Sequence, residues 1–482
     1  MSFDYDVVII GAGPIGSTLA YKIAKKGYSV AILEKKKEIG IPLQCAGIVS
    51  KKLKDINEIP DSLILNEVKG AYLHSLSHDL RVKKDKNEAL IIDRIGYDKF
   101  LAKRAIDAGA ILFKQSKVIA VDSKSGTILC QNNRKVKAKI IVGADGPKSI
   151  ASDSFNHSFK YFNATQYLIE INNKHDDIGY SNNENVGYHS NENIGFHSNE
   201  NIGFHSNENI GFHSNENIGF HSNENIGYHN NENVGYHNNE IVNEENKEFK
   251  KINKDSESII NNKTDNSNDF VDIFAISKIL PGFLWCIPTT KNSYRIGLFS
   301  NNDYKNQKII LEDFLSTNEK FKNCSIVEKY NGKIPIFDKN KNLVTDRMIL
   351  IGDAASQIKP TTGGGLILGF DICNLASDAI IKSLKDDDIH ILKKYEKNFK
   401  KKYSKELSYQ LKVQQTLEIL SDDDLDHMFL KLKEKNAEEI ISKYGDMDKQ
   451  SVLVKEFIKR GIIFSIIPKA FFRKLISIWG FK

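Results

Sequence analysis

Apolar runs and helically spaced positions alternate along this chain, which is the pattern of an α/β protein. Residues 7–10 and 30–33 are short apolar runs of a length typical of buried strands, and a helical pattern separates them. Helical spacing returns at 97–109, and the apolar run 348–351 precedes a helical pattern over 366–382. Because strands that alternate with helices form parallel sheets, the pattern predicts an α/β fold that begins with a βαβ unit.

Three spaced glycines lie in the connection between the first two strands. Gly11, Gly13 and Gly16 follow the first strand with the spacing G-x-G-x-x-G. The first glycine permits a tight turn, the second lets the backbone approach a pyrophosphate, and the third lets the helix pack closely on the sheet. Glu34 ends the second strand, where a carboxylate can accept hydrogen bonds from ribose hydroxyls. We therefore predict a dinucleotide site rather than an incidental Gly-rich turn, with no signal peptide before it.

Later turns carry residues suited to the same ligand, a flavin dinucleotide. Asp145 follows an apolar run and can fix the backbone near a cofactor, although a plain Asp-Gly turn is the alternative. Asp353 follows another apolar run, where it can reach a ribityl hydroxyl. The glycines at 363–365 open the helix from Leu366, and their amides can face a flavin ring or a pyrophosphate; the alternative is a Gly-rich linker. Arg94 precedes a helix, where its guanidinium can hold a phosphate or brace the cofactor. The alternative is an ordinary surface arginine.

An eight-residue repeat interrupts the α/β pattern within residues 175–268. From Asn183 the units read NENVGYHS, then NENIGFHS four times, then NENIGYHN and NENVGYHN, and a polar tract follows. Each unit has one aliphatic residue and one aromatic, too little apolar surface to offset the entropy of ordering, so we predict a disordered insertion. A solenoid of stacked strands is one alternative. Metal capture is another, based on the regular histidines His189, His197, His205, His213, His221, His229 and His237.

Composition is ordinary for a soluble globular protein. The 482 residues are 40% hydrophobic and 27% charged, and 68 Lys and Arg against 62 Asp and Glu leave a net charge of +6. Five cysteines occur without a C-x-x-C pair, so we expect a reducing cytosol, no disulfide framework and no metal site. No apolar run approaches the ~18 residues of a spanning helix. We expect no nucleic acid among the partners.

The end of the chain is both apolar and basic. A charged helical pattern runs from Asp388 onward, and residues 452–482 contain seven Lys or Arg against the single Glu456. Pro468 divides this segment into two short pieces. Such a segment suits the surface of an anionic bilayer. The alternative is a terminal helix that packs on the core and keeps a solvated basic face.

Four segments carry a resemblance to a known family. They are GIPLQCAGIVS at 40–50, PGFLWCIP at 281–288, GDAASQIKPTTGGGL at 352–366 and LSDDDLDHM at 420–428. Together with the glycine turns they resemble the FAD flavoproteins of the para-hydroxybenzoate hydroxylase type. Among these the chain is most similar to the geranylgeranyl reductase family, specifically the archaeal digeranylgeranylglycerophospholipid reductases. The resemblance covers most of 1–174 and 269–440, and the repeat lies outside it.

The resemblance implies a cofactor, a reaction and a set of site residues. FAD is the expected cofactor, and the reaction is reduction of an isolated prenyl C=C bond. Cys45, Phe283 and Trp285 are the expected catalytic residues, although a buried structural thiol and ordinary core aromatics are the alternatives. Ala46 and Phe283 depart from the family, which usually has Gly and Tyr there. The expected FAD-binding residues are Gly11, Gly13, Ile15, Gly16, Glu34, Cys45, Ala46, Arg94, Val118, Asp145, Asp353, Gly364, Gly365 and Leu366.

The expected architecture is α/β with an added α+β substrate sheet. The Rossmann-like FAD-binding domain takes 1–70, 90–155 and 335–385, and the antiparallel substrate-binding domain takes 71–89, 156–174 and 269–334. The repeat insertion takes 175–268 and the helical C-terminal region 386–482.

The expected partners follow from the resemblance and from the number of dinucleotide motifs in the sequence. A prenylated lipid is the expected substrate. No second G-x-G-x-x-G follows a strand, so electrons are expected from NAD(P)H, a ferredoxin-like protein or a deazaflavin. We expect a cytoplasmic protein with a peripheral contact to the inner membrane face. The alternatives are an FAD-dependent aromatic hydroxylase or halogenase, because F-x-W-x-I-P also approximates a halogenase string, and a non-enzymatic flavoprotein remnant.

Overall fold

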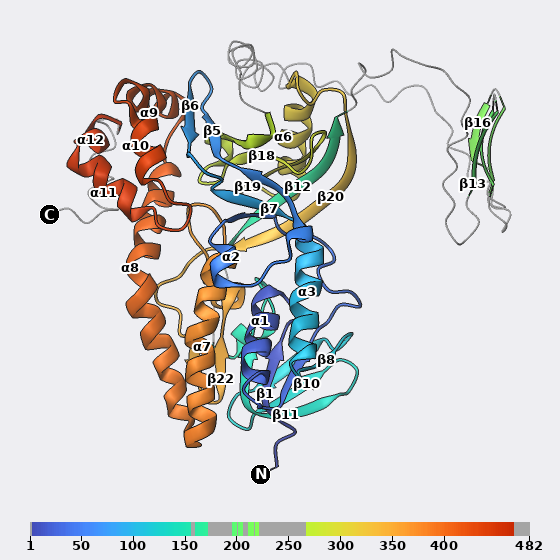
Figure 1. The fold of residues 1–482 in the computed structure, drawn as a ribbon, viewed down its shortest axis with the longest axis vertical. Coiled ribbons are helices and arrows are strands. Elements are labelled where there is room, and N and C mark those ends of the chain that lie inside the picture. The colour runs from blue at the N-terminus through green and yellow to red at the C-terminus, as the bar shows by residue number, and fades with distance from the viewer. Residues whose placement is uncertain are drawn as a thin grey trace. The chain divides into compact units, whose positions relative to one another are not determined.

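The computed structural model describes residues 2–155, 160–171, 195–199, 201–205, 211–215, 217–220 and 267–466. The chain divides into two compact units, which we describe separately. The first comprises Met1–Asn172 with Glu245–Lys482, and the second is Asn173–Glu244. Figure 1 shows the elements of both units and labels many of them.

A parallel sheet forms the base of the first unit. Its order is β21-β22-β11-β1-β2-β8, and β1, β2, β8, β11 and β22 run parallel. The strands are β1 (Tyr5–Ile10), β2 (Val30–Leu33), β8 (Ile111–Phe113), β9 (Val118–Asp122), β10 (Thr127–Cys130), β11 (Lys135–Gly143), β21 (Val344–Thr345) and β22 (Met348–Leu350). The side chains of β2 and β22 are all buried, which explains why these strands are continuous apolar runs. The predicted βαβ unit is confirmed.

Helices flank this parallel sheet and include the helices predicted from the sequence. They are α1 (Pro14–Ala24), α2 (Leu53–Ile56), α3 (Arg94–Asp107), α4 (Ile150–Asp153) and α7 (Leu366–Asp386). Helix α1 contacts both α3 and α7. Arg94 is the first residue of α3 rather than a residue before it, because Asp93 caps the helix by accepting a hydrogen bond from the amide of Gly96.

A small antiparallel sheet stands between the parallel sheet and the rest of the unit. Its order is β3-β7-β4, with β3 (Ile48–Ser50), β4 (Ile64–Val68) and β7 (Ala89–Ile92). Successive side chains of a strand point to opposite faces. Leu90 and Ile92 accordingly pack with Tyr97 of α3 and Phe370 of α7, whereas Ala89 and Ile91 belong to a second cluster that contains Trp285 and Phe299.

A seven-stranded mixed sheet forms the other half of the fold. Its order is β20-β12-β19-β18-β17-β5-β6, antiparallel except for the parallel pair β17 and β5. The strands are β5 (Gly70–His74), β6 (Asp79–Lys83), β12 (Tyr161–Ile171), β17 (Phe270–Phe274), β18 (Leu284–Pro288), β19 (Ser293–Ser300) and β20 (Cys324–Pro335). Helix α6 (Tyr304–Thr317) contacts β12 and β19 on one face.

Helices form the last part of the described chain, as predicted. They are α8 (Lys393–Leu417), α9 (Asp422–Glu434), α10 (Ala437–Tyr444), α11 (Ser451–Lys459) and α12 (Ile462–Ile466). Ser421 and Asp424 form a capping box at the start of α9, which accounts for the LSDDD sequence there. Helices α9 and α10 contact β6, so the C-terminal helices lie beside the edge of the mixed sheet (Figure 1). Residues 467–482 of the predicted basic segment lie outside the described residues.

The described part of the repeat consists of short antiparallel strands. They are β13 (Gly195–Asn199), β14 (Asn201–His205), β15 (Gly211–Asn215) and β16 (Asn217–Phe220). The eight-residue period lets identical positions pair across strands, as Phe204 pairs with Phe196 and Phe212. These paired strands are the arrangement that the alternative of stacked strands predicts, and a disordered insertion also stays a prediction here. The rest of 175–266 lies outside the described residues, where disorder stays a prediction.

Candidate active site

A cleft of about 510 Å³ opens where the parallel strands end. The residues that follow β1, β2, β11 and β22 line it together, because the carboxyl ends of parallel strands meet at one edge of a sheet. Most of the predicted cofactor residues are among its lining. They are Gly11, Gly13, Ile15, Glu34, Cys45, Arg94, Val118, Asp145, Asp353, Gly365 and Leu366.

The three glycines of the first turn have different surroundings. Gly11 has a φ of +103°, and a Cβ there would lie 2.5 Å from the carbonyl oxygen of Ala144. A Cβ on Gly16 would lie 2.2 Å from the carbonyl oxygen of Gly11, so this glycine packs the helix against the turn and does not line the cleft. A Cβ on Gly13, the N-cap of α1, would meet no atom within 4 Å. The cleft is therefore open in front of the N-terminus of α1.

Acidic residues brace the turns around the cleft. The Glu34 carboxylate accepts hydrogen bonds from the amides of Ala12 (2.8 Å) and Lys36 (2.9 Å). Asp145 accepts from the hydroxyl of Ser149 (2.5 Å) and from the amide of Ile150 (2.8 Å). Burial raises the pKa of Asp145. Both carboxylates thus hold backbone in place, and contact of Glu34 with a ribose stays a prediction.

Asp353 lies in the turn after β22 and faces the cleft. Within the described part of the chain no hydrogen bond reaches its carboxyl group. Burial raises its pKa to about 6, and Arg94 opposes that rise. Gln357 supports the turn by accepting from the amide of Gly352 (2.9 Å) and donating to the hydroxyl of Tyr395 (2.7 Å). The Asp353 carboxyl therefore stands on a fixed turn and is available to a ligand.

Arg94 is a buried cation that its protein partners do not fully satisfy. Its Nη2 atom lies 3.0 Å from Oδ1 of Asp98, one helical turn away. Asp98, with contributions from Cys45, raises the pKa of the Arg94 guanidinium although burial lowers it. Its Nε atom has no hydrogen-bond partner among the described residues. A buried donor without a partner is rare in proteins, so a polar ligand in the cleft is expected to complete this site.

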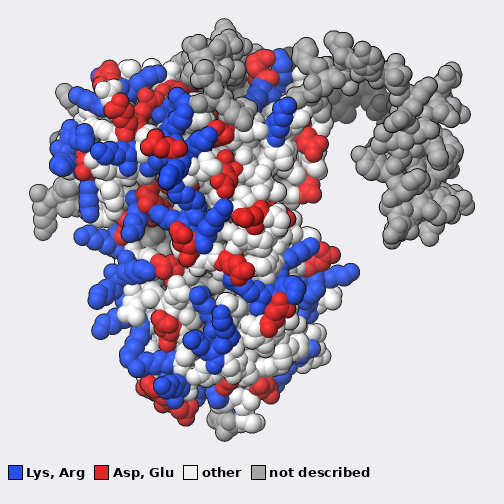
Figure 2. Space-filling view, in the orientation of Figure 1, with Lys and Arg blue, Asp and Glu red and all other residues white. Residues whose placement is uncertain are grey.

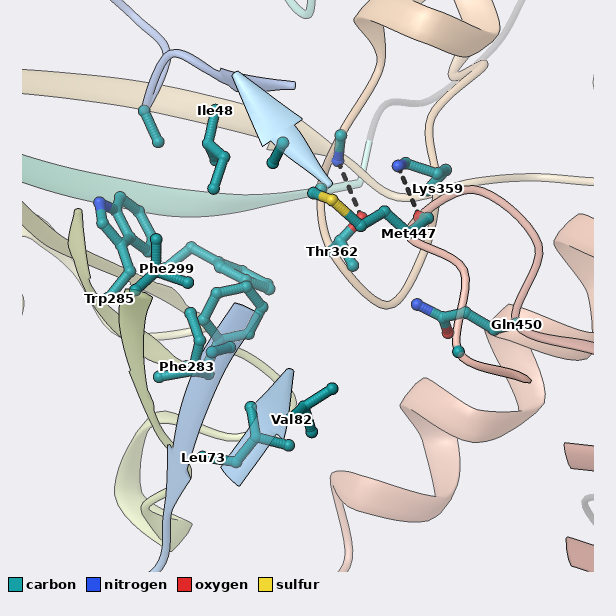
Figure 3. Close-up of a pocket in the computed structure, with 18 of the residues that line it drawn as sticks. Ile48, Leu73, Val82, Phe283, Trp285, Phe299, Lys359, Thr362, Met447 and Gln450 are labelled. Carbon is teal, nitrogen blue, oxygen red and sulfur yellow. Dashed lines mark hydrogen bonds between the residues drawn. The ribbon is translucent and has the colours of Figure 1, made fainter. Parts of the chain in front are cut away.

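An apolar cavity of about 690 Å³ adjoins the cleft (Figure 3). The mixed sheet, the small sheet and the C-terminal helices all contribute to its walls. The ring of Phe283 meets the rings of Trp285 and Phe299 edge-on, at 6.1 and 5.0 Å between centroids. The predicted pair Phe283 and Trp285 thus lies together in this cavity, as Figure 3 shows.

Cys45 lies where the cleft and the cavity meet, since it lines both. Two residues that sequence reasoning missed hold its loop. Gln166 of β12 donates to the carbonyl oxygen of Cys45 (3.4 Å) and accepts from Nε1 of Trp285 (3.1 Å). Arg295 of β19 donates to the carbonyl oxygen of Ala46 (3.0 Å). The single charged residue within the strand 293–300 was a usable signal, whereas nothing in the sequence distinguishes Gln166.

Two predicted cofactor residues lie on the cavity side instead. Ala46 and Gly364 line the cavity and are not part of the cleft lining. The side chain of Lys359 lies beside Gly364. A Cβ added at Gly364 would be 2.9 Å from the Cε atom of Lys359. Lys359 donates to the carbonyl oxygen of Met447 and pairs with Asp448, both at 2.8 Å. Gly364 therefore leaves room for a lysine that ties this loop to the C-terminal helices.

Comparisons with known proteins agree with this geometry. The family described as FAD dependent oxidoreductase matches residues 6–47. The chain is 28% identical over 462 residues to an uncharacterized protein of Methanocaldococcus jannaschii, with 95% of each chain covered. It is 24% identical over 435 residues to a digeranylgeranylglycerophospholipid reductase of the same organism, with 88% and 89% covered.

A solved structure shows the same fold. It is a geranylgeranyl bacteriochlorophyll reductase-like protein from Thermoplasma acidophilum, with a TM-score of 0.67, 20% identity and 98% of each chain covered. The fold and the cleft define an FAD-dependent oxidoreductase. Within that class the chain is similar over almost its whole length to proteins of the geranylgeranyl reductase family.

The cleft fits the FAD cofactor. The open space at Gly13 suits a pyrophosphate at a helix N-terminus, and the free donor of Arg94 and the Asp353 carboxyl are polar groups that a ligand must satisfy. Among the described residues no cluster of three His, Cys, Asp or Glu side chains could hold a metal ion. In the same part of the chain, no helix is long and apolar enough to cross a bilayer.

Proposed function

We propose that this protein reduces isoprenoid C=C bonds of geranylgeranyl ether lipids or their precursors. The observation that carries the proposal is the apolar cavity that meets the cofactor cleft at Cys45. Its volume of about 690 Å³ falls within the range of about 300–1,000 Å³ of small-ligand sites. Relatives named digeranylgeranylglycerophospholipid reductases match almost the whole chain, which supports the same substrate class.

The cavity residues suit the chemistry of an unactivated alkene. Reduced FAD supplies hydride when bound, and the chain must supply a proton and stabilise positive charge on the substrate carbons. The faces of Trp285 and Phe283 stabilise such charge by cation–π attraction, worth about 0.5–2 kcal/mol. Cys45 is placed between cleft and cavity, where its Sγ can hold the proton that reaches the second alkene carbon.

Gln166 links these groups because it contacts both the indole of Trp285 and the backbone of Cys45. It orients the aromatic wall relative to the thiol. The electron donor is a further part of the proposal: NAD(P)H, a ferredoxin-like protein or a deazaflavin would reduce the cofactor from the open side of the cleft.

An anaerobic assay tests the proposal directly. FAD-loaded protein is reduced with dithionite and mixed with detergent-dispersed digeranylgeranylglycerol phospholipid. Mass spectrometry is expected to show a gain of two hydrogens per saturated bond, with matching oxidation of the flavin absorbance. A Cys45→Ser variant is expected to keep FAD and lose most of the rate, because serine is a much weaker acid than a thiol.

Aromatic hydroxylation or halogenation is the competing function. It needs oxygen, whereas the proposed reduction does not. Product formation from an aromatic substrate in air, together with an unchanged lipid under anaerobic conditions, would overturn the proposed function.

A further inference from the structure

Helices α11 and α12 form one wall of the apolar cavity. Gly461, with a φ of +69°, makes the bend between them. Their inner faces are directed to the cavity through Leu453, Val454, Phe457, Ile463 and Ile466. The inner apolar side chains of both helices are therefore explained by the cavity that they enclose.

The outer faces of the same helices carry apolar side chains that none of the residues described in the structure covers. Phe464 is 60% exposed, the largest value for any large hydrophobic side chain in the described residues. Val452 and Ile458 of α11 are 43% and 38% exposed. One exposed apolar side chain is ordinary, but three on two short consecutive helices indicate a surface that meets an apolar partner.

Basic side chains accompany these apolar ones. Lys455 and Lys459 are exposed and lie one helical turn apart on α11, and among the residues that the structure describes neither meets a carboxylate. Arg460 is exposed and pairs with Glu456 at 3.4 Å. Figure 2 shows that Lys and Arg side chains also gather along the left edge of the molecule, over α8. Cations beside exposed apolar groups match the phosphate and acyl layers of an anionic membrane.

We infer that the outer surface of α11 and α12 docks on an anionic lipid bilayer and that the lipid substrate passes between these helices into the cavity. The docking surface consists of Val452, Lys455, Ile458, Lys459 and Phe464. The second half of the inference rests on the proposed function, because only a lipid substrate needs this route. The first half stands on the surface alone.

A bilayer fits this surface better than a second copy of the chain does. In a symmetric dimer the same patch faces itself, so the lysines of both copies would be brought together with no carboxylate of the patch to neutralise them. The apolar side chains are also separated by charged ones rather than joined in one patch. That spacing suits insertion of single side chains between headgroups.

Vesicle co-sedimentation tests the docking surface. FAD-loaded protein is mixed with vesicles of equal parts phosphatidylcholine and phosphatidylglycerol, and with vesicles of phosphatidylcholine alone. We expect binding to the anionic vesicles that falls as salt rises. Lys455→Glu with Lys459→Glu is expected to weaken it at least about tenfold, and Phe464→Ser about fivefold.

Helix α6 offers matched controls on another face. Lys305→Glu with Lys308→Glu makes the same charge change there, and Ile309, which is 49% exposed, can be changed to Ser. These variants are expected to bind vesicles as the wild type does. Equal losses on α6 and α11, or no binding by the wild type, would overturn the docking surface, as would a stable dimer in sedimentation velocity that the α11 variants abolish.

The lipid route is tested by the two forms of substrate. The α11 and α12 variants are expected to reduce detergent-dispersed lipid at the wild-type rate and vesicle-embedded lipid about tenfold more slowly. Loss in both forms, or in neither, contradicts the route. A protein that binds vesicles but reduces no prenyl lipid in detergent would refute the proposed function and leave the docking surface standing.

Discussion

The cleft and the cavity are two adjoining halves of one candidate active site, yet they are built in different ways. Backbone turns make the cleft, and the carboxylates of Glu34 and Asp145 hold those turns in place. Apolar side chains from the mixed sheet, the small sheet and the C-terminal helices make the cavity. A cofactor with fixed phosphates and rings needs fixed amides, whereas a flexible prenyl chain needs only apolar volume. The cleft should therefore tolerate few changes and the cavity more.

The largest effect is expected where a side chain would be added to the glycine turn that borders the cleft. Gly16→Val places atoms against the carbonyl oxygen of Gly11 and should abolish FAD retention and destabilise the fold by about 1–3 kcal/mol. Gly13→Ala is the control, because a Cβ there meets no protein atom. It should keep the unfolding temperature and weaken only FAD affinity. Bound-flavin absorbance and thermal unfolding measure FAD retention and stability in both variants. Full retention of FAD by Gly16→Val would contradict the expected difference between the two glycines.

The next effect concerns the aromatic wall of the cavity. Trp285→Ala removes an indole that is only 7% exposed, and we expect prenyl reduction to slow about a hundredfold as cation–π stabilisation and substrate position are lost together. FAD affinity should not change. Trp285→Phe should recover part of the rate. Single-turnover oxidation of the reduced flavin by lipid measures the rate of reduction. An unchanged rate in the alanine variant would show that the Trp285 ring serves only to pack the protein interior.

A smaller effect is expected at the junction of the two halves. Gln166→Leu breaks the contacts to Cys45 and Trp285 and should slow turnover about tenfold with little change in KM. Gln307→Leu is matched, because Gln307 is also a buried glutamine with hydrogen bonds to Ser300 and to the carbonyl oxygen of Asn163. The two variants should lose similar stability in urea titrations. An equal loss of kcat in the Gln166 and Gln307 variants would show that Gln166 has only a structural role.

The smallest effect on catalysis is expected on the far face of the mixed sheet. Buried His74 lies between Asp79 and Asp272, which raise its pKa from 6.5 to about 9 although burial lowers it. A raised histidine pKa stabilises the fold fully below pH 6.5, and this stability is lost as pH rises through about 9.

His74→Gln should accordingly flatten the pH dependence of the free energy of unfolding. The wild type should lose up to about 3 kcal/mol more than the variant between pH 6.5 and pH 9. Turnover at pH 7 should be unchanged, because His74 does not line the cavity. Parallel urea titrations across this pH range provide the measurement, and identical slopes for both proteins would contradict the assigned pKa shift.

Local patterns were sufficient for most of the cleft. The spacing of Gly11, Gly13 and Gly16 and the acids that follow strands are chemical requirements of single turns, so a short sequence window contains them. The α/β fold and the FAD cofactor were predicted in this way and are confirmed. The individual contacts of the cleft residues with the cofactor stay predictions.

Only the tertiary structure decided how distant segments combine. Gln166, Arg295 and Lys359 reach loops far from them in sequence, and such side-chain pairings depend on strand register and on the crossing of whole elements. The same holds for Gly364, where an added Cβ would meet the side chain of Lys359. The sequence by itself therefore determined the turns that line the cleft. The folded chain decided which apolar surfaces close around the cavity, because burial is shared between segments that no local pattern connects.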